Sequence, residues 1–162
     1  MPLIKDGAEI EDVWAFVPDD APIEPGGCFT VTLERFLGEG AELLLRNQSI
    51  GVRLTPDNDP HPLAAYFERL ALIEVDFPKY TDGRGYSQAQ LLRRRLGYEG
   101  ELRAVGHVLR DQLLYMHRSG FDAYSTTRAD LPSFLEAMGE FSSFYQPAAT
   151  GAAGVFAARH GR

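Results

Sequence analysis

The residues best suited to chemistry lie in one glycine-rich loop, which runs from Asp82 to Ser87 with the sequence DGRGYS. Gly83 and Gly85 allow backbone N–H groups to turn into a concave nest that binds anions. Ser87 is predicted to start the following helix, whose dipole favours negative charge at that end. Arg84 can then close over an oxyanion with bidentate contacts. The alternative is a tight turn in which Arg84 only pairs with Asp82.

A second polar cluster follows the next strand-like run. His107 precedes a helix and has Asp111 four residues on, a spacing that suits an acid–base pair. The alternatives are a capping or surface histidine and a structural ion pair between Arg110 and Asp111. The catalytic candidates are therefore His107, Arg110 and Asp111. The candidates for ligand binding are Asp82, Gly83, Arg84, Gly85, Ser87, Arg103, Arg110 and Gln112.

The composition argues against several kinds of intrinsic redox or metal centre. Cys28 is the one cysteine, so the chain cannot form an internal disulfide, a CxxC pair or an iron–sulfur cluster by itself. The four histidines show no zinc-ligand spacing, and the glycine loop is neither a Walker A motif nor a GxGxxG fingerprint. We expect no intrinsic metal, leave the cofactor unknown, and favour a reducing, cytoplasmic environment.

The elements that position these loops alternate along the chain. Apolar and β-branched runs predict strands, and apolar residues spaced three and four apart predict the helices between them. Two of these helices are predicted to end at Gly97 and Gly120, and the last helix is predicted to include Phe141 and Tyr145. The result is a β-α unit repeated about five times, with crossovers long enough to make the strands parallel. We therefore predict an α/β fold with a mainly parallel sheet of about five strands, arranged as in flavodoxin or as a partial barrel. The strands are expected near residues 28–32, 49–54, 71–77, 102–106 and 121–125.

Three charged residues interrupt these strands: Arg53, Glu74 and Arg103. Strands covered on both faces are nearly all apolar, so the charges favour a sheet with a partly open face or an incomplete barrel. In parallel sheets the ligands gather beyond the carboxyl ends of the strands. That edge is expected to hold Asp76, both polar loops and Thr126.

We expect one domain with two appended segments. Residues 1–27 are acidic and rich in turn residues and form an N-terminal extension with one short strand candidate near Trp14. Residues 28–146 form the α/β domain, and residues 147–162 a flexible tail of small residues. We expect no signal peptide, because the first residues carry several acids and no apolar run.

The charge distribution limits the classes of binding partner that this chain can have. The net charge is −7, which argues against a general nucleic-acid binder, and no apolar stretch is long enough to cross a membrane. Arginines gather in residues 84–118, which favours either a solvated helix face or a site for an anion or an acidic partner. The oligomeric state stays open.

The segment FPKYTDGRGYSQAQLLRRRLGYEGELRAVGHVLRDQLLYMHRSGFDAY, Phe77 to Tyr124, resembles the signature region of a bacterial family. That family is of unknown function and is described as a probable oxidoreductase involved in sulfite reduction. Members often carry Asp where this chain has His107 and Cys where it has Ser119, which argues against an obligatory catalytic role for either position. The matching residues are Asp82, Gly83, Arg84, Gly85, Ser87, Gln88, Leu92, Arg93, Glu101, Arg103, Gly106, Arg110, Asp111 and Gln112.

The resemblance implies a role in sulfate assimilation and cysteine biosynthesis. Our leading expectation is an accessory protein of sulfite reduction that binds an oxyanion or a phosphorylated ligand at the loop from Asp82 to Ser87. The first alternative is an oxidoreductase that uses an externally bound flavin or nicotinamide cofactor. The second is a non-catalytic partner that docks on sulfite reductase through Arg93, Arg94 and Arg95.

Overall fold

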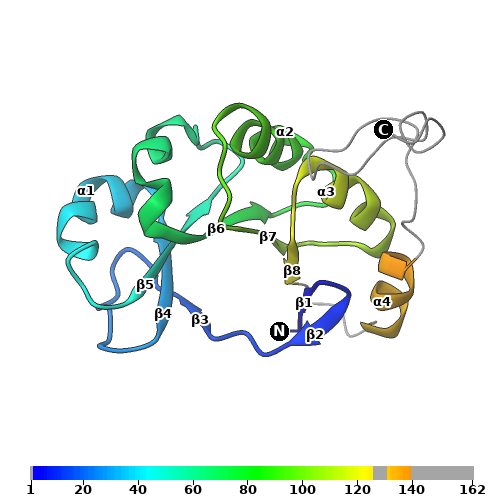
Figure 1. Cartoon of the computed structure of the whole chain (residues 1–162), viewed down its shortest axis with the longest axis horizontal. Helices are drawn as coiled ribbons and strands as arrows, with labels where there is room; N and C mark the ends of the chain where they lie inside the picture. Colours follow the sequence, from blue (N-terminus) through cyan, green and yellow to red (C-terminus); the bar gives the residue numbers. More distant parts are fainter. Residues whose placement is uncertain (1, 126–130, 140–162) are drawn as a thin grey trace, which may run out of the picture.

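The computed structural model describes residues 2–125 and 131–139. The described strands form one mixed sheet in the order β2-β1-β8-β7-β6-β5-β4-β3 (Figure 1). Strands β3 to β8 run parallel, and β1 pairs antiparallel with both β8 and β2. The strand bounds are β1 Leu3–Lys5, β2 Ala8–Ile10, β3 Trp14–Phe16, β4 Cys28–Thr32, β5 Ser49–Leu54, β6 Leu70–Phe77, β7 Glu101–Gly106 and β8 Ala123–Ser125.

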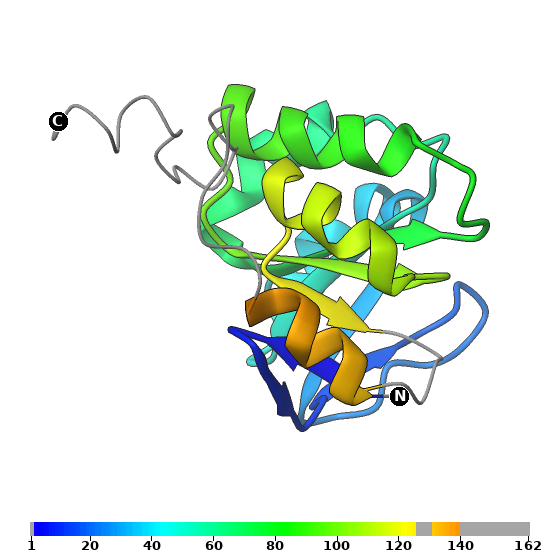
Figure 2. The ribbon, with the colours of Figure 1, turned by 90° about the vertical axis from the view of Figure 1, so that its right-hand side faces the viewer.

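The helices that connect successive strands from β4 to β8 gather on one face of the sheet (Figures 1 and 2). Helix α3 ends at Gly120, which has φ 113°, as the sequence predicts. The short helix α4 packs against α3, and residues predicted to extend it beyond Gly139 lie outside the described residues. The helix bounds are α1 Leu33–Leu43, η1 His61–Arg69, α2 Arg84–Gln90, η2 Leu91–Arg95, η3 Arg110–Gln112, α3 Leu113–Ser119 and α4 Leu131–Gly139.

These observations confirm the prediction of an α/β fold with a mainly parallel sheet. The predicted number of about five strands is too low, because residues 1–27 supply β1, β2 and β3 to the same sheet. Strands β3 to β8 lie in sequence order without a reversal. Right-handed crossovers that all advance in one direction place their helices on the same face. The flavodoxin-like alternative has a reversal and helices on both faces, and it differs from this arrangement.

The sheet is strongly curled, and chain geometry shows why. Strands β2 and β3 are the two edges of the sheet, yet only residues 11–13 join them; we call this link the strap. A link of this length spans at most about 14 Å, at ~3.6 Å per residue. Eight flat strands spaced about 4.8 Å apart would measure about 34 Å across. The edges must therefore approach each other, and the strap crosses the concave face (Figure 1).

Side-chain alternation divides the two faces of the sheet. Val31, Val52, Ile73 and Leu102 are neighbours across four strands and are fully buried in the main core under the helices. The next register row belongs to the concave face and consists of Thr32, Arg53, Glu74 and Arg103. A strand alternates its side chains with a period of two, so one face is apolar and the other carries the charges.

Candidate functional site

Arg84, the centre of the predicted anion loop, already holds two carboxylates. Its Nη2 and Nε donate to Asp82 at 2.7 and 3.0 Å, and its Nη1 pairs with Asp57. The hydrogen bonds from Arg84 lower the pKa of Asp82 to about 2, and the two carboxylates raise the pKa of Arg84. The alternative of a turn with an Arg84–Asp82 pair is thus present in the structure. A ligand anion at Arg84 would have to compete with both acids.

The glycines and the serine of this loop do not have the predicted roles. Helix α2 begins at Arg84, and the carboxylate of Asp82 accepts from the backbone N–H of Arg84, so the prediction that Ser87 starts the helix is wrong. Gly83 has φ −83°, outside the left-handed region. A Cβ on Gly85 would lie 2.6 Å from the ring of Phe77. Gly85 therefore allows α2 to pack closely on β6.

The second polar loop lies beside the first, as predicted. Gln112 Nε2 donates to the carbonyl of Tyr80 at 2.7 Å, and the N–H of His107 donates to the carbonyl of Phe77 at 2.8 Å. Within the described residues, no hydrogen bond joins His107 and Asp111, and both are exposed. Arg110 Nε donates to the carbonyl of Ser133 at 3.0 Å, which ties the loop to α4. The predicted position Thr126 lies outside the described residues.

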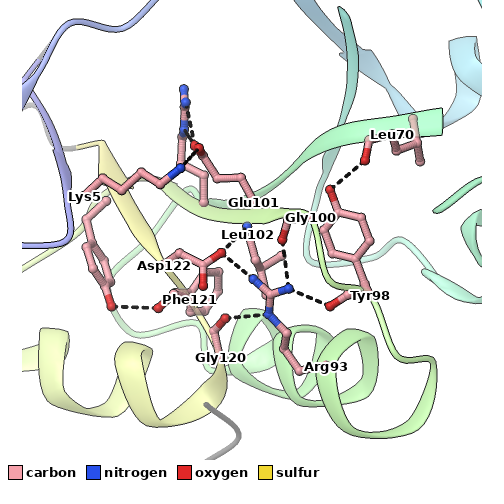
Figure 3. A network of polar contacts seen from close by, with 12 residues as sticks. Lys5, Leu70, Arg93, Tyr98, Gly100, Glu101, Leu102, Gly120, Phe121 and Asp122 are labelled. Atoms are coloured by element: carbon pink, nitrogen blue, oxygen red, sulfur yellow. Dashed lines mark hydrogen bonds and ion pairs between the residues drawn. The ribbon is translucent and has the colours of Figure 1, made fainter. Parts of the chain in front are cut away.

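Arg103, predicted to bind ligand with these loops, lies instead on the concave face and is 1% exposed. Its Nη1 donates to Asp12 of the strap at 2.9 Å, and its Nε and Nη2 donate to Glu101 Oε1 at 2.9 and 2.7 Å. Lys5 of β1 holds the other oxygen of Glu101 at 2.8 Å (Figure 3). This chain of contacts joins β1, β7 and the strap.

Glu74 sits next to Arg103 in the same row and is 3% exposed. Its Oε2 accepts from Arg53 Nε at 2.7 Å and from Thr30 Oγ1 at 3.0 Å. The guanidinium of Arg53 also stacks on Phe16, with Cζ 3.8 Å from the ring centroid. Two contacts therefore fix the plane of this guanidinium. Among the described residues, nothing accepts a hydrogen bond from its Nη1 or Nη2.

A cavity of about 350 Å³ opens between this face of the sheet and the strap. Arg53 and Glu74 form part of its wall from the sheet side, and Ser125 adds a buried Oγ that has no hydrogen-bond partner among the described residues. A cavity of this size, with a few placed polar groups against aromatic walls, has the character of a small-molecule site. Its lining residues are Asp12, Trp14, Phe16, Arg53, Glu74, Val105 and Ser125.

Asp76 lies at the carboxyl end of β6, two residues beyond Glu74 and half buried. Burial raises the pKa of its carboxyl, Glu74 adds to the rise, and Arg53 and His107 oppose it. The folded state then binds the proton more tightly than the unfolded chain, so this residue makes the fold less stable as pH rises above the ordinary value of 3.8. We expect Asp76→Asn to raise the urea midpoint at pH 7.

The stability that Asp76→Asn gains at pH 7 should disappear well below pH 3.8, because the wild-type carboxyl is then protonated in both the folded and the unfolded protein. Urea unfolding followed by circular dichroism at several pH values measures this difference. A loss of stability that is equal at acid and neutral pH would instead assign Asp76 a purely structural role.

The sequence contained a signal for the concave site, since Arg53, Glu74 and Arg103 stood out as charges within strands. It did not show that they are adjacent, because register is a tertiary property. Trp14 and Phe16 were missed as wall residues because they lie in the predicted N-terminal extension, which the structure adds to the sheet as β3 beside β4. Within residues 2–125 and 131–139, no group of three His, Cys, Asp or Glu residues is placed to hold a metal ion. No helix in that part of the chain is long and apolar enough to cross a membrane.

Comparison with known protein families identifies the family of this chain. The model of a family described as bacterial protein of unknown function (DUF934) matches residues 51–156, which is more than half of the chain. This protein belongs to the DUF934 family. Searches of curated proteins and of solved structures found no match. The matched region of this DUF934 protein covers most of β5 and all of β6 to β8, whereas the strap and β1 to β4 lie before it.

Proposed function

We propose that this DUF934 protein binds a small ligand through an anionic group at Arg53, as a cytoplasmic accessory protein of assimilatory sulfite reduction. The observation that supports this most directly is the state of the Arg53 guanidinium. Glu74 and Phe16 hold it in place, while Nη1 and Nη2 have no described acceptor and the residue lines the cavity. A guanidinium fixed in this way is preorganised for bidentate contact with a carboxylate or an oxyanion.

The site in this proposal differs from the one expected from sequence. An anion at the loop from Asp82 to Ser87 meets a guanidinium that already contacts Asp82 and Asp57, and both acids repel it. At Arg53 only Glu74 is bound, through Nε, so the two terminal nitrogens stay available. The link to sulfite reduction rests on the resemblance of Phe77 to Tyr124 to that family's signature.

A binding experiment compares the two arginines directly. Sulfite and acetate are titrated into the wild type, Arg53→Gln and Arg84→Gln, and binding is followed by calorimetry and by the thermal midpoint. Loss of a charge-assisted, bidentate contact of about 1.5–3 kcal/mol should weaken binding at least tenfold in Arg53→Gln. Arg84→Gln should bind like the wild type.

If Arg84→Gln bound the anions more weakly and Arg53→Gln bound them like the wild type, the binding site would be the loop from Asp82 to Ser87. Absence of binding and of thermal stabilisation with both anions would refute anion binding altogether. The cellular part is tested with a deletion strain grown on sulfite as the sole sulfur source. Complementation by the wild type and by Arg84→Gln, but not by Arg53→Gln, is expected.

The alternative of docking on sulfite reductase was based on three arginines, and one of them is not available at the surface. Arg93 faces inward: its Nε donates to Gly120 O at 2.9 Å and its Nη1 to Tyr98 O and Gly100 O at 2.6 and 2.8 Å (Figure 3). Its Nη2 pairs with Asp122. A partner surface on this helix would therefore have to rely on Arg94 and Arg95 rather than on all three arginines. The oxidoreductase alternative stays a prediction.

A further inference from the structure

The cavity at Arg53 also has an acceptor group. Asp12 of the strap lines it, and Asp12 Oδ1 accepts from the N–H of Trp14 at 3.1 Å and from Arg103 Nη1 at 2.9 Å. Among the described residues, nothing donates to the second oxygen, Oδ2. The cavity therefore combines a pair of unengaged donors on β5 with an unengaged carboxylate oxygen on the strap.

The two arginines and two carboxylates that are linked by ion pairs at the cavity balance one another before a ligand enters. Arg53 and Arg103 carry the positive charges, and Glu74 and Asp12 carry the negative ones. The neighbouring Lys5–Glu101 pair is neutral as a unit. A simple anion adds one uncompensated charge to this partly buried set, which costs free energy in a medium of low dielectric. A ligand with one positive and one negative group adds none.

The remaining wall fits the apolar part of such a ligand. Trp14 and Phe16 come from β3, and Val105, which is 4% exposed, comes from β7. Aromatic rings and a β-branched side chain favour a short hydrocarbon or thioether group over a further polar one. The volume of about 350 Å³ is at the low end of the range for small-molecule sites and suits a ligand of amino-acid size.

We infer that the ligand is a small zwitterion of the α-amino acid type, with its carboxylate at Arg53 and its ammonium group at Asp12. This inference rests on the proposed anion contact at Arg53 and adds the second contact. The ammonium–carboxylate contact is charge-assisted, and the Asp12 side chain that accepts it is 25% exposed. The strap then contributes to recognition as well as to closing the concave face.

Matched pairs of probes test the second contact. L-alanine is compared with propionate, and L-leucine with 4-methylpentanoate, since each pair differs only by the ammonium group. Calorimetric titration of the full-length protein should show the amino acid binding about tenfold more tightly than its acid partner. Ethylamine, which lacks the carboxylate, should bind more weakly than alanine.

Two variants assign the contacts to residues. Asp12→Asn keeps an oxygen that can accept from Trp14 and Arg103 but removes the charge, so it should abolish the preference for the amino acid and retain the binding of propionate. Arg53→Gln should weaken both members of a pair. Circular dichroism and urea unfolding show whether Asp12→Asn stays folded, and Asp12→Glu provides a second variant that keeps the charge and is expected to retain the preference.

The outcomes separate this inference from the proposed function. Equal affinity for alanine and propionate in the wild type would overturn the zwitterion assignment and leave the anion contact in place. A preference that survives in Asp12→Asn would overturn the role of Asp12. No binding by either member of both pairs would overturn the inference together with the anion site.

Discussion

Replacing Arg103 with methionine is expected to destabilise the fold by about 3–5 kcal/mol, the range for removing one partner from a buried ion pair. Arg103 is 1% exposed and contacts Asp12 and Glu101, with Glu74 3.7 Å away. Methionine leaves these carboxylates without their shared cation in a place that water reaches poorly. Urea unfolding at pH 7 measures the loss.

A matched control is Arg84→Met, because Arg84 also contacts two carboxylates but is exposed. Water solvates the acids left behind in that variant, so the loss should be much smaller. Equal losses in the two variants would contradict the view that burial makes the concave network important. Arg103→Met should also free Asp12 from its arginine partner, so a smaller preference for an amino acid over its acid partner is expected in this variant.

Replacing Arg93 with methionine is expected to cost about 2–4 kcal/mol, because several acceptors lose their donor at once. Arg93, in the middle of the π-helical turn η2, donates to three carbonyls, those of Tyr98, Gly100 and Gly120, and to the carboxylate of Asp122 (Figure 3). Asp122 Oδ2 in turn accepts from the N–H of Leu102 at 2.9 Å. One side chain thus fixes the chain entering β7 and the chain entering β8.

Arg95→Met on the same helix is the control, since Arg95 is exposed and should tolerate the change. Arg93→Lys distinguishes geometry from charge: lysine cannot span the four acceptors, so it should recover only a small part of the stability. Full recovery by lysine would show that charge alone matters. A co-purification defect with sulfite reductase in Arg95→Met, at unchanged stability, would favour the docking alternative.

Much of the scaffold could be predicted because its signals are local. The run from Leu70 to Phe77 is apolar and β-branched, and Gly97 and Gly120 both adopt positive φ where helices were predicted to end. Alternation of such strands with helices implies right-handed crossovers and hence a parallel sheet. The two polar loops follow neighbouring strands β6 and β7, so their proximity follows from this topology as well.

The predicted anion site failed in its detail for a physical reason. A glycine next to an arginine and an aspartate is compatible with a nest, a packing contact or a capped helix start, and backbone conformation decides among them. In the structure Gly85 packs on Phe77, and Arg84 is bound by Asp82 and by Asp57 from the preceding strand–helix connection. The second acid is 27 residues away in sequence, so no local pattern indicates it.

By itself the sequence determined the order along the chain of the strands and helices from β4 to β8, the parallel direction of those strands, and the presence of unusual charges at Arg53, Glu74 and Arg103. Only the tertiary structure decided that these charges form one row and that Asp12, Trp14 and Phe16 face them. Register fixes the row, and the three-residue strap draws the edges of the sheet together. Both depend on contacts between segments far apart in the chain, which short-range propensities do not encode.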